Sequence, residues 1–373
     1  MIIGIDGNEA NVEKRVGIGE YNFELLRQFK EFPLSNIKFQ IYLKNPPLAS
    51  MPVESENWKY RIVGPKKLWT QIGLPFDLFT HSPRPDVFFT PTHYAPRFCP
   101  VPSVISVMDL SYLYFPELFK AADLYQLKNW TAYSVRNARK IFTISDASKN
   151  DIIKWYKVPS ERVVVAYPGI KGIPSSGIKK YTMSGLDKKF GVSSPYILFV
   201  STLQPRKNIV RLIEAFSQLK SKKSLELVIV GKKGWLYEEI LHAPAVYGVS
   251  GRVKFLDFVL DEDLPSLYSH AQFFILPSLY EGFGLPILEA MKYGCPVITS
   301  NVSSLPEVGG DAALYVNPLD VADISEKMQE ILDNDSLRKK LIEAGKKQIL
   351  KFSWEKSAKK TLDVLRDMVG GSI

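Results

Sequence analysis

Residues 280–300, YEGFGLPILEAMKYGCPVITS, hold two carboxylates at a spacing that suits a ligand with a hydroxyl-rich group at each end. Glu281 precedes a Gly-Phe-Gly turn, and Glu289 falls on the helix expected after it. Backbone N–H groups at a helix start have no helical partner and favour an anion such as a diphosphate. The pattern predicts a nucleotide-sugar site in which Glu281 binds sugar hydroxyls and Glu289 binds ribose hydroxyls. The helix start between them consists of Gly282, Phe283, Gly284 and Leu285.

The alternative is that Glu281 is a solvated loop acid and Glu289 a surface acid, and the intervening glycines disfavour it. A second charged pair, Arg206 and Lys207, follows the strand-like YILFVS in a strand-to-helix loop. Ligands of open α/β sheets bind at such loops. Cations there would neutralise a departing diphosphate, although a basic pair at a helix start is the plain alternative.

Two features of the first half point to an acceptor side. Asp109 ends the strand-like SVISVMD and is expected to point toward the ligand-binding edge of its sheet. Gly17 and Gly19 form a glycine turn before a helix, where backbone amides can approach a phosphate or an acceptor. A lone Gly-x-Gly is weak evidence, and an ordinary turn is the alternative.

A metal ion is not expected. Asp261, Glu262 and Asp263 imitate a metal-binding Asp-x-Asp, but acids at the start of a helix explain them better. A third interpretation is that Asp261, which follows the strand ending at Val259, accepts hydrogen bonds from guanine N1–H and N2–H; this favours a GDP-linked donor. The four His residues have no ligand spacing, so we expect them to be surface or locally hydrogen-bonded residues.

Composition indicates a two-domain globular protein. The chain has 373 residues, 46% of them apolar, and no apolar run is long enough to span a bilayer. The start reads as a first strand and not as a signal peptide, and the two cysteines, Cys99 and Cys295, have no metal or redox spacing. These features fit the cytoplasm.

The charge is uneven along the chain. Residues 1–190 hold 26 Lys and Arg against 17 Asp and Glu, which equals the whole net charge of +9. The excess suggests an anionic partner such as lipid headgroups, a lipid-linked phosphate or nucleic acid, with a solubilising surface as the alternative. Scattered basic residues disfavour nucleic acid. Residues 65–79, PKKLWTQIGLPFDLF, read either as an interfacial membrane segment or as a helix with one core face.

Short apolar runs alternate with amphipathic segments, which predicts an α/β protein with doubly wound parallel sheets. We expect a first domain over 1–190, joined by a C-terminal helix over 353–373, and a second domain over 191–352. Residues 171–194 read as the linker. The expected strands are 2–6, 38–43, 86–90, 103–109, 140–145, 163–167, 196–201, 225–231, 253–259, 272–276, 296–299 and 313–316. The expected helices are 18–30, 121–138, 146–156, 208–219, 235–245, 262–270, 284–293, 320–334 and 352–368.

The donor-site segment, with LPEVGGDAAL after it, resembles retaining glycosyltransferase family 4. The resemblance extends over nearly the whole chain, including GIGEYNFELLRQF, MDLSYLYFPE, FTISDASKNDI, YILFVSTLQPRKNIVRLIEAF and FSWEKSAKKTLDVLRDM. It implies a GT-B fold, with two Rossmann-like domains facing a cleft and a last helix crossing back to the first domain. It also implies metal-independent transfer of a hexose from a nucleoside diphosphate sugar, with Lys207 at the phosphates and the base pocket near Val259 and Asp261.

The segment TLQPRKN, which begins at Thr202, is similar to mannosyltransferases of O-antigen and exopolysaccharide assembly. This implies GDP-mannose as donor, a saccharide or lipid-linked acceptor, and a peripheral position on the inner face of the membrane. Two residues depart from the family. Met108 stands where related sequences usually have His, and Thr202 where many have Arg. Either Arg206 replaces that arginine or the diphosphate is held less tightly. An epimerase of the same fold and a non-catalytic nucleotide-sugar-binding protein are the alternative functions.

Overall fold

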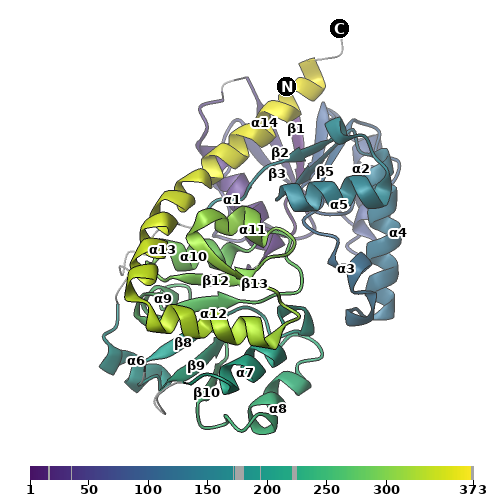
Figure 1. Ribbon diagram of the computed structural model, residues 1–373. Helices are drawn as coiled ribbons and strands as arrows, with labels where there is room; N and C mark the ends of the chain where they lie inside the picture. Colours follow the sequence, from purple (N-terminus) through teal and green to yellow (C-terminus); the bar gives the residue numbers. More distant parts are fainter. Residues whose placement is uncertain are drawn as a thin grey trace. The chain divides into compact units, whose positions relative to one another are not determined.

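The computed structural model describes residues 1–15, 17–34, 36–170, 172, 180–193, 195–220 and 225–370 (Figure 1). The chain forms two compact units. The first contains residues 1–169 and 353–373, and the second contains residues 170–352.

The first unit is built on a seven-stranded parallel sheet in the order β3-β2-β1-β4-β5-β6-β7. Its central strands carry runs of fully buried apolar residues, as expected for a sheet covered on both faces. Neighbouring strands are joined by crossover segments that bring the carboxyl ends of all strands to one edge. The strands are β1 (Ile2–Asp6), β2 (Lys38–Leu43), β3 (Trp58–Ile62), β4 (Val87–Thr90), β5 (Ser103–Ser106), β6 (Lys140–Thr143) and β7 (Val163–Val165).

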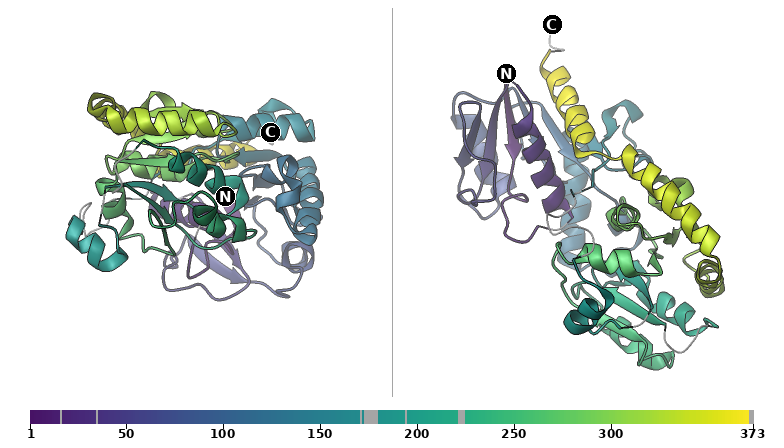
Figure 2. Two further views of the ribbon diagram at one scale, coloured as in Figure 1. Left: turned by 60° about the horizontal axis from the view of Figure 1, so that its bottom comes forward. Right: turned by 90° about the vertical axis from the view of Figure 1, so that its left-hand side faces the viewer.

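The C-terminal helix completes the core of this first unit. It packs against α1, and the Trp354 ring lies 5.8 Å from the Tyr21 ring between centroids. The right-hand view of Figure 2 shows this last helix, in yellow, beside the purple helix α1 of the first unit. The helices of the unit are α1 (Ile18–Glu31), α2 (Leu74–Thr80), α3 (Ser111–Tyr114), α4 (Ala121–Asn137), α5 (Asp146–Tyr156) and α14 (Trp354–Gly370).

The second unit has a six-stranded parallel sheet in the order β10-β9-β8-β11-β12-β13. Its strands are β8 (Tyr196–Val200), β9 (Glu226–Val230), β10 (Val253–Leu256), β11 (Phe273–Leu276), β12 (Val297–Ser300) and β13 (Ala313–Val316). Its helices are α6 (Met183–Phe190), α7 (Ile209–Ser217), α8 (Glu238–Val246), α9 (Leu264–His270), α10 (Leu285–Lys292), α11 (Leu305–Gly309), α12 (Val321–Asp333) and α13 (Asp335–Gln348). Both sheets bear out the predicted α/β class.

The structure corrects the predicted linker at 171–194. Residues 171, 173–179 and 194 lie outside the described part of the chain, but Met183–Phe190 form helix α6. Thr182 caps that helix by accepting the Gly185 N–H, and Gly191 ends it in the left-handed region. Helix α6 packs against α9, so the second unit begins at Ile170 and not at residue 191.

This boundary also changes the charge argument. The first unit holds 25 Lys and Arg against 19 Asp and Glu, and the second holds 23 against 20. The excess is therefore shared, with more of it on the first unit. Every helix in the described part of the chain is too short or too polar to cross a bilayer.

Candidate functional site

The helix start that the sequence singled out is built on Gly284. This residue has φ 116° and precedes helix α10, and a Cβ added to it would lie 3.0 Å from Leu305 Cδ2. Only glycine adopts this backbone without strain. Pro286 stands in the first turn, where its missing N–H costs nothing. The Phe283 ring is buried with its centroid 5.5 Å from that of Phe352, so the turn offers its backbone and not this ring to a ligand.

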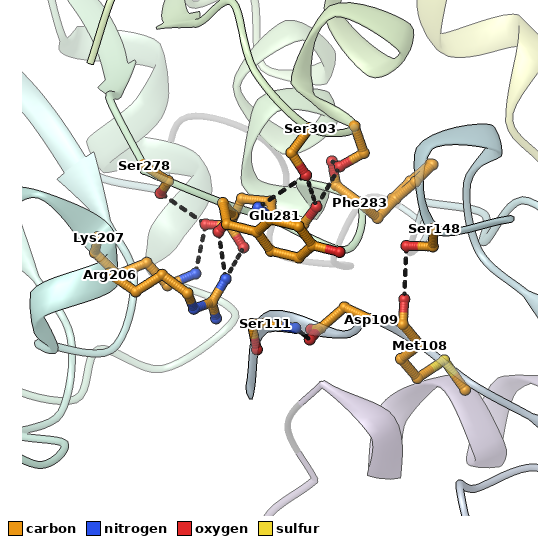
Figure 3. A network of polar contacts seen from close by, with 12 residues as sticks. Met108, Asp109, Ser111, Ser148, Arg206, Lys207, Ser278, Glu281, Phe283 and Ser303 are labelled. Carbon is orange, nitrogen blue, oxygen red and sulfur yellow. Dashed lines mark hydrogen bonds and ion pairs between the residues drawn. The ribbon is translucent and has the colours of Figure 1, made fainter. Parts of the chain in front are cut away.

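Glu281 is the centre of a buried polar network (Figure 3). Its Oε1 accepts hydrogen bonds from Lys207 Nζ at 2.5 Å and from Ser278 Oγ at 2.7 Å. Its Oε2 lies 3.2 Å from Arg206 Nη1. The Glu281 and Lys207 side chains are 9% and 10% exposed, so this is a buried ion pair and not a solvated contact. The structure thus brings together three of the predicted site residues.

The network fixes the charge of Glu281. Burial alone would raise the pKa of its carboxyl, but the charges of Lys207 and Arg206, with the hydrogen bonds from Lys207 and Ser278, outweigh that effect. The pKa falls to about 2, and the carboxylate is ionised at neutral pH. It is therefore an acceptor of hydrogen bonds and not an acid.

The cationic pair is held rigidly. Pro205–Lys207 form a single 3₁₀ turn after β8. Asn208 follows with a left-handed backbone and is the N-cap residue of helix α7. The Asn208 Nδ2 donates to the carbonyl oxygens of Pro277 and Pro318 at 3.0 and 2.6 Å. Arg206 Nη1 also donates to the Tyr280 carbonyl oxygen. These contacts anchor the β8–α7 loop to the segment that carries Glu281.

Sequence reasoning missed the serines that support this segment. Ser303 Oγ accepts the Glu281 N–H at 3.2 Å and donates to the Glu281 carbonyl oxygen. Ser304 Oγ contacts the carbonyl oxygens of Glu281 and Phe283 at 2.9 and 2.8 Å. The signal was present, because the polar NVSS directly follows a buried strand at the same sheet edge.

The other residues predicted for the donor side do not belong to the Glu281 network. Glu289 is half-buried on α10, and Tyr268 Oη donates to its Oε2 at 3.1 Å. Val259 is buried, whereas Thr202 and Asp261 are exposed. The predicted strand over 253–259 ends at Leu256, so Val259 and Asp261 lie in the loop before α9.

Asp263, the last residue of the acidic run, has a structural role. It is 1% exposed, and its carboxylate pairs with Lys189 Nζ at 2.6 Å and Lys180 Nζ at 3.1 Å. Tyr181 Oη donates to it at 3.0 Å. Burial opposes ionisation, but the bonds from Lys189, Lys180 and Tyr181 prevail and lower its pKa. The described residues contain no group of three or more His, Cys, Asp or Glu placed to hold a metal ion.

In the first unit, Asp109 is not at the end of a strand, which corrects the prediction. Strand β5 stops at Ser106, and Asp109 lies in the following loop, where its Oδ1 accepts the Ser111 N–H at 2.9 Å (Figure 3). The Met108 N–H donates to His93 Nε2 at 3.1 Å. Burial lowers the pKa of His93 against the opposing charge of Asp109, so His93 is a neutral acceptor here.

Gly17 is the N-cap of helix α1, as predicted for a residue before the helix, but Gly19 lies within the first turn of α1 and not ahead of it. Gly17 has φ 51° with open space around it, whereas a Cβ on Gly19 would lie 2.8 Å from the Glu9 carbonyl oxygen. Gly19 thus allows close contact between the helix and the β1–α1 loop.

Asp6 is a further candidate that the sequence analysis did not single out. It ends β1, is 5% exposed, and accepts two hydrogen bonds from Asn8, from the backbone N–H at 3.1 Å and from Nδ2 at 2.7 Å. Burial outweighs these bonds and the attraction of Lys44, and raises the pKa of Asp6 to about 6. A buried acid with a raised pKa at the carboxyl edge of a parallel sheet is a common mark of a functional site.

Comparisons with known proteins agree with this geometry. A family model described as "Glycosyltransferase Family 4" matches residues 38–171, and one described as "Glycosyl transferases group 1" matches residues 187–348. The O-antigen chain mannosyltransferase B of Escherichia coli is 34% identical over 312 residues, which cover 82% of this chain and 79% of that protein. The chain belongs to glycosyltransferase family 4.

This family 4 glycosyltransferase is also 34% identical over 233 residues to the serotype-specific mannosyltransferase WbdA of Escherichia coli, a match to 61% of this chain and 28% of that longer protein. Sucrose-phosphate synthase from Thermosynechococcus elongatus superposes with a TM-score of 0.75 at 17% identity, over the full length of both chains. Anabaena HepE, solved with UDP and glucose, gives 0.74 at 20% identity over 98% of this chain and 99% of that one. These structures show that the fold is GT-B.

Proposed function

We propose that this glycosyltransferase moves mannose from GDP-mannose to a hydroxyl of a lipid-linked saccharide, with retention of the anomeric configuration and without a metal ion. The relatives named above as mannosyltransferases support the sugar and the kind of pathway. The single observation that carries the site is the buried Glu281 carboxylate, held between Lys207 and Arg206 beside the start of α10.

The diphosphate is the proposed partner of the two cations. Lys207 and Arg206 share one carboxylate, Glu281, so the three groups together carry a net charge of +1. A donor diphosphate would bring at least two negative charges to these cations. Arg206 thereby supplies the second cation that many family members place at the position of Thr202. As the bond to the sugar breaks, charge grows on the leaving phosphate, and fixed cations in a buried site stabilise that change.

Glu281 is proposed to orient the sugar. Its ionised carboxylate accepts hydroxyl hydrogen bonds, and its two oxygens are already fixed by Lys207, Ser278 and Arg206. Preorganised acceptors need no rearrangement when the sugar arrives. The backbone N–H groups from Gly282 to Leu285 face the same diphosphate in this scheme.

The transfer step needs no protein nucleophile in this scheme. The acceptor oxygen forms a bond to the anomeric carbon on the face from which the phosphate leaves, and its proton passes to the departing phosphate oxygen. Products are the glycoside and GDP, and the charges balance. The role of the protein is to position both substrates and to exclude water, because water would otherwise take the acceptor's place.

The other residues are assigned by the same scheme. Glu289 would bind the ribose hydroxyls, and the segment carrying Val259 and Asp261 would read the base, with Thr202 nearby in the donor site. On the acceptor side we propose Asp109 with the Gly17–Gly19 turn. The proposed location is the cytoplasm, at the inner face of the membrane, where a lipid-linked acceptor and an anionic surface are available.

Thermal unfolding with GDP, UDP and ADP, each with and without EDTA, tests the donor. Ligand at ~100 times its dissociation constant stabilises the folded state by roughly 2.7 kcal/mol. Of the three nucleotides, we expect only GDP to raise the melting temperature, and by the same amount with and without EDTA. An equal or larger rise with UDP or ADP would contradict the GDP assignment.

A transfer assay tests the rest of the proposal. Purified enzyme is given GDP-mannose and a lipid-linked saccharide, and the anomeric configuration of the product is read by NMR. We expect an α-mannoside from the α-linked donor. A β-linked product would overturn retention, and donor turnover that does not depend on the acceptor would overturn transfer.

A further inference from the structure

The helical segment at residues 68–80 is apolar on both faces, which is unusual for a surface element. Its inner face belongs to the core, where Trp69, Leu74 and Leu78 pack with Tyr42 and Phe88. An ordinary surface helix carries polar residues on its other face. Here the outer face carries four large apolar side chains, named below as the apolar stripe: Leu68, Ile72, Phe76 and Phe79, which are 49%, 52%, 66% and 47% exposed.

The spacing of the stripe residues places them on one face of the helical turns. Ile72, Phe76 and Phe79 follow a spacing of 4 and 3 residues, which keeps side chains on one side of a helix, and Leu68 is the cap residue directly before the helical turns. The π-helical turn Trp69–Gly73 runs directly into α2, so the face is continuous. Contiguous exposed apolar surface of this kind marks an interaction site.

A neighbouring loop adds to this surface. Phe98 is 76% exposed, and its loop is tied to the segment by Arg97, whose N–H donates to the Thr70 carbonyl oxygen at 3.1 Å and whose Nε donates to Gln71 Oε1 at 2.8 Å. Both Phe98 and Leu68 have positive φ, near 50°. A bulky residue rarely adopts this backbone, and local strain at exposed apolar residues is typical of functional surfaces.

The charges around the stripe are cationic. Residues 59–97 hold six Lys and Arg against two acids. One of the acids, Asp77, is buried and paired with Arg61 at 2.6 Å, and the other, Asp86, accepts the Ile2 N–H at 2.6 Å. The exposed cations are Lys59, Lys66, Lys67 and Arg84.

We infer that the apolar stripe inserts into the interfacial region of an anionic lipid bilayer, with the surrounding Lys and Arg on the headgroups. Apolar side chains facing outward between cations match this environment, because the chains enter the acyl boundary while the charges meet anionic lipid. A second copy of the chain fits this surface less well. A two-fold contact uses the same surface of both copies, so the cations of one copy would face the cations of the other. The inference rests on the proposed function in one respect: a lipid-linked acceptor explains why this enzyme would bind a membrane.

Vesicle sedimentation without donor or acceptor tests the inference. Wild type is compared with Ile72→Ser/Phe76→Ser/Phe79→Ser on vesicles of phosphatidylglycerol and phosphatidylcholine, and on phosphatidylcholine alone. The matched control is Val246→Ser/Leu350→Ser, which removes two apolar side chains that are each 73% exposed in the second unit. We expect a partition coefficient on anionic vesicles that is lower by roughly tenfold or more for the triple variant and unchanged for the control.

The charge component has its own variant. Lys66→Gln/Lys67→Gln should weaken binding to anionic vesicles by several-fold. The difference from wild type should largely disappear at high salt, which screens the charges. Equal binding of wild type and triple variant, or binding that ignores lipid charge, would overturn the inference. So would a wild-type dimer that the triple variant dissociates without a change in vesicle binding.

The donor site provides an independent readout. The stripe residues are not part of the proposed donor site, so the shift in melting temperature with GDP should be the same in wild type and triple variant. Loss of vesicle binding with an intact GDP shift supports the inference. Absence of a GDP shift in both proteins would reject the proposed donor and leave the vesicle result standing.

Discussion

The proposed chemistry of this enzyme depends on one buried carboxylate, Glu281, whose charge is fixed by its neighbours. Glu281 has two cations and a hydroxyl within hydrogen-bonding or ion-pairing distance, and these hold its pKa at about 2. An isolated buried carboxylate would instead be protonated. The same cations that keep Glu281 ionised are the groups proposed to receive the diphosphate, so both substitutions below probe one network.

Replacing members of this network separates binding from folding. We expect Lys207→Met to lower the transfer rate by roughly tenfold or more, because one cation of the leaving-group site is lost. Glu281→Ala should lower transfer at least as much and also cost about 3–5 kcal/mol of folding stability, since it leaves Lys207 buried without a carboxylate. Steady-state kinetics and denaturant unfolding measure the two effects.

Glu281→Gln is the control for this experiment. It retains an oxygen for Ser278 and Lys207 and should fold more stably than Glu281→Ala. Near-normal transfer by both Lys207→Met and Glu281→Gln would contradict the roles assigned to the network.

Asp6 allows a prediction about pH. Its folded-state pKa is raised from 3.8 to about 6, so the folded protein holds the proton more tightly than the unfolded chain does. Its contribution to stability is therefore complete below about pH 4 and is lost as the pH rises through 6, a loss of about 3 kcal/mol. Asp6→Asn keeps an oxygen for both Asn8 bonds and removes the titration.

The measurement is the free energy of unfolding of both proteins between pH 4 and pH 8. Relative to wild type, Asp6→Asn should gain stability as the pH rises, with most of the gain below pH 7. A constant difference across this range would show that Asp6 is not the titrating group. A large loss of transfer in a stable Asp6→Asn protein would identify Asp6 as a residue that the sequence analysis missed.

The identities of these residues were easier to predict than their surroundings. The pairing of Arg206 and Lys207 with Glu281 joins positions about 75 residues apart, and sequence pattern placed each of them in a loop at the ligand-binding edge. The sequence did not predict the residues that hold the Glu281 segment in place, or which further acid is buried. Ser303 and Ser304 act through their neighbours' backbone atoms, and Asp6 became notable only through its burial.

Among the elements, the β1–α1 connection shows how one glycine differs from its neighbour. A Cβ on Gly19 would collide with the Glu9 carbonyl oxygen at 2.8 Å, and a Cβ on Gly17 would meet open space. We expect Gly19→Ala to displace the start of α1 and cost about 2 kcal/mol or more, because backbone must move. Gly17→Ala meets open space, but its backbone, with φ 51° and ψ −113°, is strained for any residue with a side chain, so this variant should also lose about 1–3 kcal/mol.

Denaturant unfolding of the two variants gives these costs, and hydrogen exchange at the first turn of α1 reports the displacement. Gly17→Ala serves as the matched control, since it adds the same methyl two residues away. If Gly19→Ala keeps the stability of wild type and leaves exchange at the first turn of α1 unchanged, the close contact at Gly19 is not what constrains the turn.

Three of the elements that sequence pattern missed, β3, α6 and α13, have little buried apolar surface. Strands β9 and β11, which are buried throughout, and β8, which is buried except at Val200, were predicted within one or two residues, because continuous apolar runs indicate a covered sheet. Strand β3 lies at the edge and buries only Trp58 fully, and α13 buries just Leu341, Gly345 and Gln348. Helix α6 is held by charges on Asp263, and periodicity does not record such contacts.

For the whole molecule, the chain path matters as much as the two sheets. The chain enters the second unit at Ile170 and returns at Ser353, so the last helix belongs to the first unit although it follows the second in sequence. The sequence resemblance predicted this return, since the final segment matches the family's last helix. The boundary near residue 170 was not predicted, because the lysine- and glycine-rich stretch resembles a linker even where it is helical.

The returning helix therefore couples the C-terminus to the stability of the first unit. Leu365 on α14 is fully buried in the core that includes Tyr21 and Leu25 of α1. Leu365→Ala should cost about 2–5 kcal/mol, as large-to-small changes in a packed core do. Arg366→Ala, at the next and exposed position, should be within about 0.5 kcal/mol of wild type.

Hydrogen exchange then shows where the loss falls. If α14 is part of the first core, Leu365→Ala increases exchange in α1 and β4, whereas the strands of the second sheet keep their protection. The proposed donor site lies in the second unit, so the stabilisation of that unit that we expect from GDP should persist in the variant. Increased exchange confined to the second sheet would mean that the last helix stabilises a different core from the one it occupies in this structure.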